Sequence, residues 1–162
     1  MSPRLVVLCG TAYSGKSTLA ADLARQLDAR IVSLDEINER RGLWGGDGIP
    51  VEQWKATHAI ATNEVREHLA SGTSVILDDT SSLRFLRDGW RALAANLGAG
   101  FRLVYLDVDH ATIRRRRAAN QTNQHRRDVS DAVLEEHLAT FEPPAPDEYA
   151  VRVRPGDPTP ML

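Results

Sequence analysis

The sequence has one cysteine, two lysines, no repeat and no long apolar run among its 162 residues. A single cysteine cannot form a disulfide within the chain, and we interpret Cys9 as a buried, small apolar residue rather than a reactive thiol. The apolar residues 5–9 near the N-terminus are too few for a signal-peptide core or for a membrane span. These absences favour one cytoplasmic domain that does not enter a membrane.

The sequence also lacks an excess of either charge, since its formal net charge is −2 at pH 7. That balance weighs against a dedicated nucleic-acid binder, because such proteins gain much of their affinity from clustered positive charge. Hydrophobic residues make up 42% of the chain, which is enough to build a core in a domain of this length. The function therefore has to be sought in local motifs.

One motif follows the first apolar run. Residues 10–17 read Gly-Thr-Ala-Tyr-Ser-Gly-Lys-Ser, the full pattern G-x-x-x-x-G-K-[ST] of a phosphate-binding loop, and a helix-forming stretch comes after it. Because glycine takes positive φ without steric cost, Gly10 and Gly15 would let successive N–H groups face one phosphate. Lys16 would contact the β- and γ-phosphates, and Ser17 would take a place in the coordination of Mg²⁺. The residues expected to hold the nucleotide are Gly10, Thr11, Ala12, Tyr13, Ser14, Gly15, Lys16, Ser17 and Thr18, the last of which would pack or hydrogen-bond locally.

Short apolar runs alternate with helical patterns along the rest of the chain, which is typical of a parallel sheet covered on both faces. The sequence predicts an α/β, three-layer P-loop NTPase fold with a five-stranded parallel sheet, in one domain over residues 1–154, and a flexible tail over 155–162. Predicted strands are 4–9, 30–34, 74–78, 102–108 and 150–154, and predicted helices lie near 16–28, 51–70, 83–97, 110–120 and 130–141. Residues 43–50 form a glycine-rich loop inside the domain.

Acidic residues follow two of the predicted strands. Asp35 ends the second strand, where the carboxyl ends of parallel strands form a ligand crevice, so it is a candidate general base for an attacking hydroxyl. Its alternative role is the N-cap of a helix that starts at Glu36. Asp78 ends the third strand and is the candidate ligand for Mg²⁺ and its water shell. The neighbouring Asp79 would point to the other side of a continuing strand, which makes one of this pair a bystander.

Six arginines and no acid occur between residues 110 and 127. Four of them are consecutive, so on a helix at least one must face a nucleotide that lies beside it, while the others are solvated or pair with acids. A guanidinium group that contacts phosphate oxygens stabilises charge in the transferring group. Nucleic-acid contact is an alternative for the whole cluster. The arginines are Arg114, Arg115, Arg116, Arg117, Arg126 and Arg127.

Together, the loop GTAYSGKST, the run VILDDTS at 75–81 and the segment RRDVSDAVLEEHLATFEPP at 126–144 resemble the small P-loop kinases grouped with polynucleotide kinase and zeta-toxin kinases. The resemblance covers residues 4 to about 148 and implies an adenylate-kinase-like core, ATP with Mg²⁺, and transfer of the γ-phosphate to a hydroxyl. It implies a small lid near 114–130 in which Arg116 matches the catalytic lid arginine and Arg126 contacts the nucleotide. By the same resemblance, Lys16 and Asp35 are catalytic, and Ser17 and Asp78 hold the metal.

Two positions depart from the family pattern. In polynucleotide kinases an arginine typically stands three residues after the catalytic aspartate, and this chain has Asn38 at that position. The lid helix of the family often repeats an arginine four residues after the first, and this chain has Asn120 there. Both departures weigh more against a 5′-hydroxyl polynucleotide acceptor than against kinase chemistry. We therefore predict a kinase that acts on a small hydroxylated molecule such as a sugar, a nucleoside or an antibiotic-like compound. The alternatives are a polynucleotide 5′-hydroxyl kinase and an ATP-binding switch or interaction protein without an acceptor.

The sequence also predicts where the acceptor is chosen. Residues 42–58 would shape acceptor specificity, and Trp44 and Trp54 within them are candidates for stacking on a ring, although packing is the commoner role of tryptophan. His58, His125 and His137 are interpreted as surface or packing residues, because no metal-ligand spacing links them.

Overall fold

The computed structural model describes residues 2–124 and 126–162. In this part of the chain, five parallel strands form one sheet in the order β2-β3-β1-β4-β5. This is the predicted fold class, an α/β sheet with helices on both faces. The strands are β1 (Arg4–Cys9), β2 (Arg30–Ser33), β3 (Val75–Asp78), β4 (Gly100–Leu106) and β5 (Val151–Val153).

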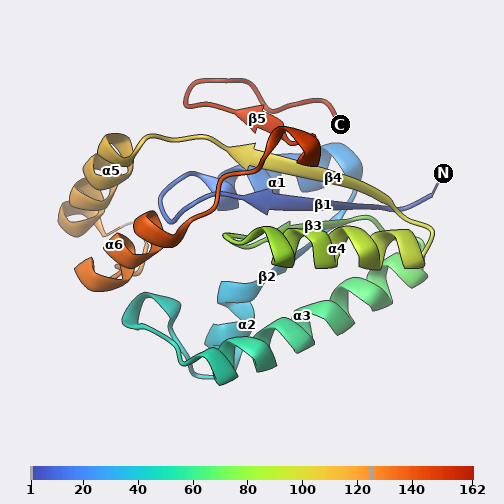
Figure 1. The fold of residues 1–162 in the computed structure, drawn as a ribbon, viewed down its shortest axis with the longest axis horizontal. Helices are drawn as coiled ribbons and strands as arrows, with labels where there is room; N and C mark the ends of the chain where they lie inside the picture. The colour runs from blue at the N-terminus through green and yellow to red at the C-terminus, as the bar shows by residue number, and fades with distance from the viewer. Residues whose placement is uncertain (1, 125) are drawn as a thin grey trace.

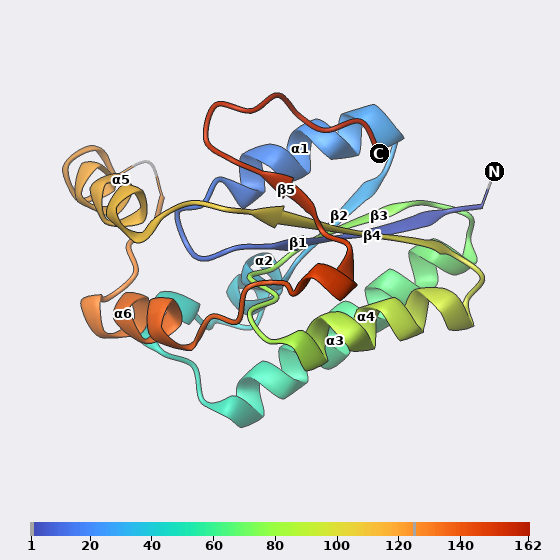
Figure 2. The ribbon, with the colours of Figure 1, turned by 45° about the horizontal axis from the view of Figure 1, so that its top comes forward.

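Six α-helices connect and cover these strands in the described residues. Helix α1 lies on one face of the sheet, α3 and α4 lie on the other, and α5 and α6 extend beyond the carboxyl ends of the strands (Figures 1 and 2). None of the described helices combines the length and the apolar character that a membrane span requires. The helices are α1 (Lys16–Leu27), α2 (Leu34–Arg40), α3 (Val51–Ala70), α4 (Arg84–Asn96), α5 (His110–Asn123) and α6 (Asp131–Thr140), with short 3₁₀ helices η1 (Gly45–Asp47) and η2 (Pro146–Glu148).

The central strand β1 explains why the sheet has two cores. Its alternate side chains are buried on opposite faces, with Leu5 and Val7 in the core beneath α3 and α4, and Val6 and Leu8 in the core beneath α1. Cys9 belongs to the first core, and burial raises the pKa of its thiol to about 12, as expected for an inert buried cysteine. Because the side chains of β1 are buried on both faces of the sheet, the end of this strand has a fixed position, and the phosphate-binding loop begins there.

A third, smaller core joins the phosphate-binding loop to α5 and α6. Tyr13 of the loop packs with Ile113 of α5, Val129, and Leu134 of α6. The segment near 114–130, the predicted lid, therefore packs against this loop.

One buried ion pair fastens the segment after α6 to the sheet. The Arg87 guanidinium on α4 is 1% exposed and donates to both carboxylate oxygens of Glu148, at 2.7 and 3.1 Å. It also donates to the carbonyl oxygens of Ser81 and Glu142, at 2.9 Å each. Burial alone would raise the pKa of Glu148, but the hydrogen bonds from Arg87 and from the Ala145 N–H outweigh burial and lower it. No local sequence pattern marks this pair.

Helix α2 differs from the prediction. The sequence predicted a strand over 30–34 that ends at Asp35, whereas β2 stops at Ser33 and Asp35 lies in the first turn of α2. Ser33 is the N-cap, and its side chain accepts a hydrogen bond from the Glu36 N–H, so the alternative role of Asp35 as N-cap is also wrong. The strand prediction ran too far because the apolar residue Leu34 continues the apolar run of β2.

The C-terminal residues have defined contacts, in contrast with the flexible tail predicted for 155–162. Gln26 on α1 donates to the Pro160 carbonyl oxygen at 3.2 Å, and Thr159 donates to Asp22 of the same helix at 3.2 Å. Leu162 packs against the core beneath α1. The tail therefore lies along α1, as Figure 2 also shows.

Candidate active site

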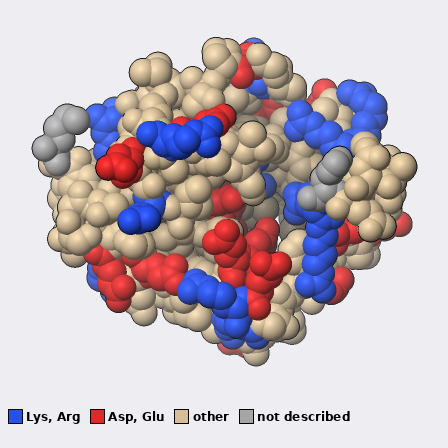
Figure 3. Space-filling view, turned by 180° about the vertical axis from the view of Figure 1, so that it is seen from behind, with Lys and Arg blue, Asp and Glu red and all other residues tan. Residues whose placement is uncertain are grey.

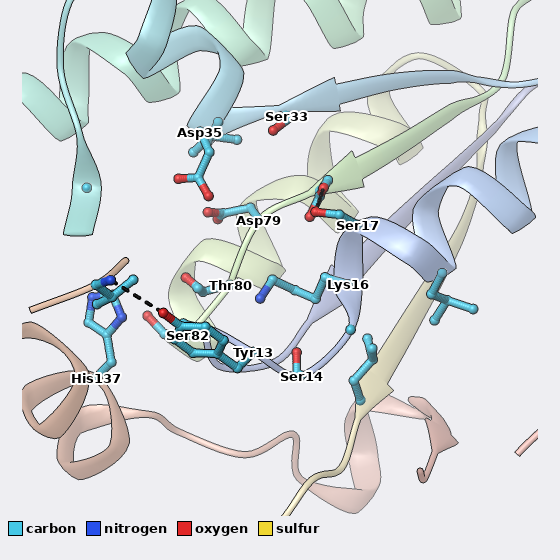
Figure 4. A pocket seen from close by; sticks show the side chains of 18 of the residues that line it. Tyr13, Ser14, Lys16, Ser17, Ser33, Asp35, Asp79, Thr80, Ser82 and His137 are labelled. Carbon is cyan, nitrogen blue, oxygen red and sulfur yellow. Dashed lines mark hydrogen bonds between the residues drawn. The ribbon is translucent and has the colours of Figure 1, made fainter. Parts of the chain in front are cut away.

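A cavity of about 1560 Å³ lies at the carboxyl ends of the strands. Its walls come from the phosphate-binding loop, the start of α2, the first half of α3, the residues after β3, and the lid. Figure 3 shows the face of the molecule that it hollows, and Figure 4 shows a close view in which side chains that line it are drawn as sticks. Four sequence-predicted residues from different parts of the chain, Lys16, Asp35, Asp78 and Arg116, line this one cavity.

The phosphate-binding loop uses its two glycines for different reasons. Gly15 has φ +95°, a left-handed conformation that glycine adopts freely. Gly10 has no positive φ, and its reason is space, because a Cβ there would lie 2.8 Å from Ser14 Oγ and 3.3 Å from Leu106. Within this loop, Tyr13 also has a positive φ, at +63°. The Ser14 hydroxyl is buried and has no hydrogen-bond partner among the described residues, so the loop holds an unsatisfied polar atom inside the cavity.

Lys16 begins α1 and bends back over the loop. Its Nζ donates to the Thr11 carbonyl oxygen at 2.8 Å. Burial lowers the pKa of Lys16, and the negative charges of Asp78, Asp35 and Asp79 oppose that shift. The ammonium group therefore has one backbone partner and three carboxylates nearby, none of which forms an ion pair with it.

Ser17 and Asp78 are in contact, as their predicted metal role requires. The Ser17 hydroxyl donates to Asp78 Oδ2 at 3.0 Å. Burial raises the pKa of Asp78, while Lys16 and the hydrogen bond from Ser17 lower it in part. The described residues contain no cluster of three or more histidine, cysteine, aspartate or glutamate side chains that would bind a metal by themselves. A hydroxyl beside one carboxylate is the donor set of a magnesium site completed by water and phosphate oxygens.

Asp79 is the residue that sequence reasoning underestimated. Its carboxylate accepts a hydrogen bond from the Ser81 N–H at 3.2 Å and lines the cavity instead of pointing away. Burial raises its pKa to about 6, and the negative charge of Asp35 adds to the shift. Because β3 ends at Asp78, the alternation expected for a continuing strand does not apply to Asp79. The two consecutive acids after an apolar run were the sequence signal that could have indicated Asp79 as a cavity residue.

Asp35 keeps its place in the site although its local structure was predicted wrongly. Its side chain is exposed to the cavity, and it forms no hydrogen bond or ion pair with any described residue. Figure 4 shows the charged ends of Asp35, Asp79 and Lys16 directed into the same space. The first turn of α2, capped by Ser33, fixes the position of this carboxylate.

Two of the arginines predicted in the lid reach the loop. Arg116 Nη1 donates to the Tyr13 carbonyl oxygen at 2.9 Å, and the Arg126 guanidinium lies 4.5 Å from the centroid of the Tyr13 ring. Both line the cavity. Of the neighbouring arginines, Arg114 pairs with an acid of α6, and Arg117 pairs with acids at and just before the start of α6. The arginines of this segment are therefore divided between the cavity and ion pairs with acids near the start of α6 and on α6.

The lid also contacts the glycine-rich loop directly. The Tyr13 hydroxyl donates to Asp128 Oδ1 at 2.9 Å, and the Asp128 carbonyl oxygen accepts a hydrogen bond from Trp44 Nε1 at 2.9 Å. The Ser130 N–H donates to the Gly46 carbonyl oxygen at 2.9 Å. Trp44 is therefore a packing and hydrogen-bonding residue between lid and loop, and Tyr13 connects it to the phosphate-binding loop.

The two asparagines that depart from the family pattern have structural partners. Asn38 is fully buried and accepts a hydrogen bond from the Thr57 hydroxyl at 2.5 Å. Asn120 exchanges two hydrogen bonds with the Arg126 backbone, at 2.9 and 3.0 Å, and so shapes the turn that follows α5. Neither side chain supplies the positive charge that arginine would bring.

The histidines contribute no positive charge to the cavity wall. His58 and His137 both line it, and burial lowers the pKa of each ring, so both are neutral at physiological pH. His58 lies 4.8 Å from the Trp90 ring, which agrees with a packing role, but its Nε2 is buried without a hydrogen-bond partner in the described residues. His125 lies outside the described residues.

Comparison with known sequences and structures connects this geometry to a family. A family described as AAA domain matches residues 5–144. A KTI12 homologue of Arabidopsis thaliana is 29% identical over 152 residues, which are 86% of this chain and 47% of that protein. The chain spans less than half the length of this curated relative, and a still smaller share of the other curated proteins it matches.

Two solved structures share the fold at low sequence identity. Kti12 of Chaetomium thermophilum, in complex with ADP-AlF3, has a TM-score of 0.75 and 19% identity, over 95% of this chain and 90% of that one. The APS kinase of Mycobacterium tuberculosis, in complex with AMPPNP and APS, has a TM-score of 0.71 and 18% identity, over 98% and 91% of the two chains. The predicted resemblance to P-loop kinases is thus confirmed. The chain belongs to this AAA domain family and has the P-loop kinase fold.

Proposed function

We propose that this protein is an ATP-dependent kinase that transfers the γ-phosphoryl group of ATP to a hydroxyl of a small molecule. One observation carries the proposal. A single cavity contains a phosphate-binding loop with its Ser17–Asp78 contact, and also Asp35, a carboxylate on a separate element that no described residue pairs. A protein that only bound nucleotide would have no need of that carboxylate beside the phosphates.

The residues present fit ATP and Mg²⁺. The buried, unpartnered Ser14 hydroxyl and the left-handed Gly15 suit a loop that binds phosphate oxygens, and Ser17 with Asp78 would hold the metal. When bound, ATP supplies the phosphoryl group and Mg²⁺ offsets negative charge on the phosphates. Lys16, Arg116 and Arg126 would bind phosphate oxygens from the loop and from the lid.

Asp35 would act on the acceptor. Its carboxylate is free to accept a hydrogen bond from an acceptor hydroxyl and to take the hydroxyl proton as the oxygen attacks. Asp79, whose pKa is raised to about 6 by burial, is ionised at neutral pH and would hold the acceptor or its water beside Asp35. The contact between Tyr13 and Asp128 would keep the lid over the site and limit access of water.

A second candidate function has support of its own. The relation to KTI12 proteins extends over most of the chain, and it favours a nucleotide-dependent interaction protein whose partner responds to nucleotide state. The third candidate, a polynucleotide 5′-hydroxyl kinase, loses support because Asn38 is buried and because acids line the cavity opposite the phosphate-binding loop.

One experiment separates the three. The purified protein is incubated with ATP and Mg²⁺ against a panel of sugars, nucleosides, amino alcohols and a 5′-hydroxyl oligonucleotide, and product is detected by mass spectrometry, with Lys16→Ala as the control. A phosphorylated small molecule that the control does not make supports the proposal. Phosphorylation of the oligonucleotide alone identifies a polynucleotide kinase. Nucleotide binding with no phosphorylated product contradicts both kinase functions.

A further inference from the structure

Helix α2 places its acidic and basic side chains on different sides. Asp35, Glu36 and Glu39 line the cavity. Arg40 and Arg41 are turned away from it and donate hydrogen bonds to residues of α3 at 2.6 to 2.9 Å. The side of α2 that faces the acceptor is therefore acidic, because its two arginines are used in packing against α3.

The acids on this wall have no cationic partner in the described part of the chain. Neither the three acids of α2 nor Asp79 forms an ion pair there. The cation that α3 places on the cavity, Lys55, already pairs with Glu52 at 3.5 Å. Figure 3 shows acidic side chains gathered beside the hollow in this face of the molecule. The α2 wall of the cavity thus carries unpaired negative charge, whereas Lys16, Arg116 and Arg126 lie at the phosphate-binding loop. Arg127 also lines the cavity, but it already pairs with Asp47 at 3.6 Å and lies over the Trp44 ring.

Aromatic and apolar side chains lie among these acids. A Cβ at Gly45 would lie 3.2 Å from the Trp54 indole and 3.8 Å from Asp35 Oδ1, so the ring and the carboxylate both lie beside Gly45 in the cavity wall. Phe85 and Val51 also line the cavity and are 68% and 67% exposed. Carboxylates beside an indole form a setting that attracts an ammonium group, through charge and through the cation–π interaction.

The neutral histidines are consistent with this setting. His58 and His137 lie in the same cavity, and burial keeps both rings uncharged at neutral pH. The buried Nε2 of His58 and Nδ1 of His137 have no partner among the described residues. The two rings therefore do not repel a cation in the cavity.

We propose that the acceptor is a small hydroxylated amine, such as an amino sugar or an aminocyclitol, which binds in its protonated form. The proposal rests on the proposed kinase function for the transfer step. In that step the acceptor hydroxyl oxygen forms a bond to the γ-phosphorus, the bond from that phosphorus to the bridging oxygen of ADP breaks, and Asp35 takes the hydroxyl proton. The ammonium group stays protonated and lies between the α2 acids and Trp54.

The test compares acceptors that differ in charge on one skeleton. Glucosamine is compared with glucose and glucuronate, and 2-deoxystreptamine with inositol, in the presence of Mg²⁺ and nucleotide at low ionic strength. Binding is measured by isothermal titration calorimetry, and transfer by product formation. We expect the amines to bind about 5- to 10-fold more tightly than the neutral compounds, since exposed ion pairs and cation–π contacts each contribute modestly. Glucuronate should bind least.

A pair of variants locates the preference. The double variant Glu36→Gln, Glu39→Gln should lower the affinity for amines far more than the affinity for neutral compounds, because it removes two negative charges from the α2 wall. Glu67→Gln removes the same kind of charge from an exposed position of α3 outside the cavity and should keep the preference. Equal or tighter binding of the neutral or anionic compounds, or no binding of any, would overturn the amine proposal.

The two proposals fail in different ways. Transfer to neutral or anionic acceptors without a preference for amines would overturn the amine inference and leave the kinase function in place. Tight, Glu36- and Glu39-dependent binding of amines with no transfer to any of them would instead contradict the kinase function, and the amine site would stand as a binding site.

Discussion

Two regions of this molecule hold charged side chains, and they differ in how those charges are paired. At Arg87 the buried guanidinium donates to both oxygens of the Glu148 carboxylate, and two carbonyl oxygens accept hydrogen bonds from its Nη1. In the cavity, Lys16 has only a backbone partner, and Asp35 has none among the described residues. Both regions lie at the same end of the sheet.

The difference separates folding from function. A fully paired buried ion contributes to a single native structure, and removing either partner leaves the other without compensation. An incompletely paired group costs stability, and is retained where a ligand completes its interactions. Charge around Arg87 should therefore control stability, whereas charge in the cavity should control activity.

The largest effect is expected at Arg87. Arg87→Ala leaves Glu148 buried without a partner and should lower the free energy of unfolding by about 3–5 kcal/mol, measured by urea denaturation. The double variant Arg87→Met, Glu148→Leu should recover much of that loss, because it removes both charges. A loss below 1 kcal/mol in Arg87→Ala would show that the pair does not hold the segment after α6 in place.

The next largest effect, at Lys16, should be on turnover and not on stability. Lys16→Ala should lower turnover about 100- to 1,000-fold, because it removes one charge-stabilising donor from the site. Its urea midpoint should change little, since the buried ammonium has a single backbone hydrogen bond. A folded Lys16→Ala protein with normal turnover would contradict the role of the loop, and a large loss of stability would remove the contrast with Arg87.

Asp35→Asn tests the base directly. We expect ATP affinity to stay nearly unchanged while phosphoryl transfer falls about 100-fold or more, the usual size of a general-base contribution. Stability should hardly change, because the cap of α2 is Ser33 and asparagine keeps the size of the side chain. If transfer per folded molecule is intact, Asp35 is not the base, and Asp79→Asn becomes the variant to compare.

Asp79 should link stability to pH. Its pKa is raised to about 6 in the folded protein, so the folded state holds the proton more tightly than the unfolded chain does, and the ionised form disfavours folding above pH 6. Asp79→Asn should therefore raise the free energy of unfolding by roughly 1–2 kcal/mol at pH 8. The gain should shrink as the pH falls from 6 to 4. The exposed Glu67→Gln variant should have no such profile, and a gain independent of pH would refute the assignment.

The smallest effect is expected on the outside of the lid. Arg114 and Glu135 pair at 3.0 Å, but both side chains are more than half exposed. Arg114→Ala should change the urea midpoint little, and that change should disappear in high salt. A larger loss would mean that exposed lid pairs matter as much as the buried pair, and would weaken the comparison between the two regions.

Local pattern predicted most of the fold. Alternation of apolar runs with helical segments was enough for the five strands and for the parallel sheet, and the phosphate-binding loop was found because its spacing is fixed by the backbone. The errors came where two elements share one apolar run. The apolar residue Leu34 was predicted to end a strand, but it begins helix α2, which Ser33 caps. The start of the helix depends on the hydrogen bond from the Glu36 N–H to the Ser33 side chain, which an apolar pattern does not reveal.

Residues that a local motif marks one by one were placed in the cavity from the sequence, whereas pairs formed by residues far apart in the sequence were missed. Arg87 and Glu148 are 61 positions apart, and nothing near either residue marks the pair. Tyr13 occupies a variable position of the loop pattern, so its contact with Asp128 had no signal. Asp79 was judged by strand alternation, which ends one residue earlier, so its burial and raised pKa were not foreseen.

The separation of 61 residues between Arg87 and Glu148 in the sequence also sets an order of events during synthesis. At a rate of about 5–20 residues per second, the chain holding Arg87 waits several seconds before Glu148 is made. Until then α4 carries a guanidinium with no carboxylate to meet it, and closing the core beneath α4 would strip that charge of water. The core is therefore expected to stay hydrated until the ribosome has made residue 148, so that products ending before this residue remain open to proteases.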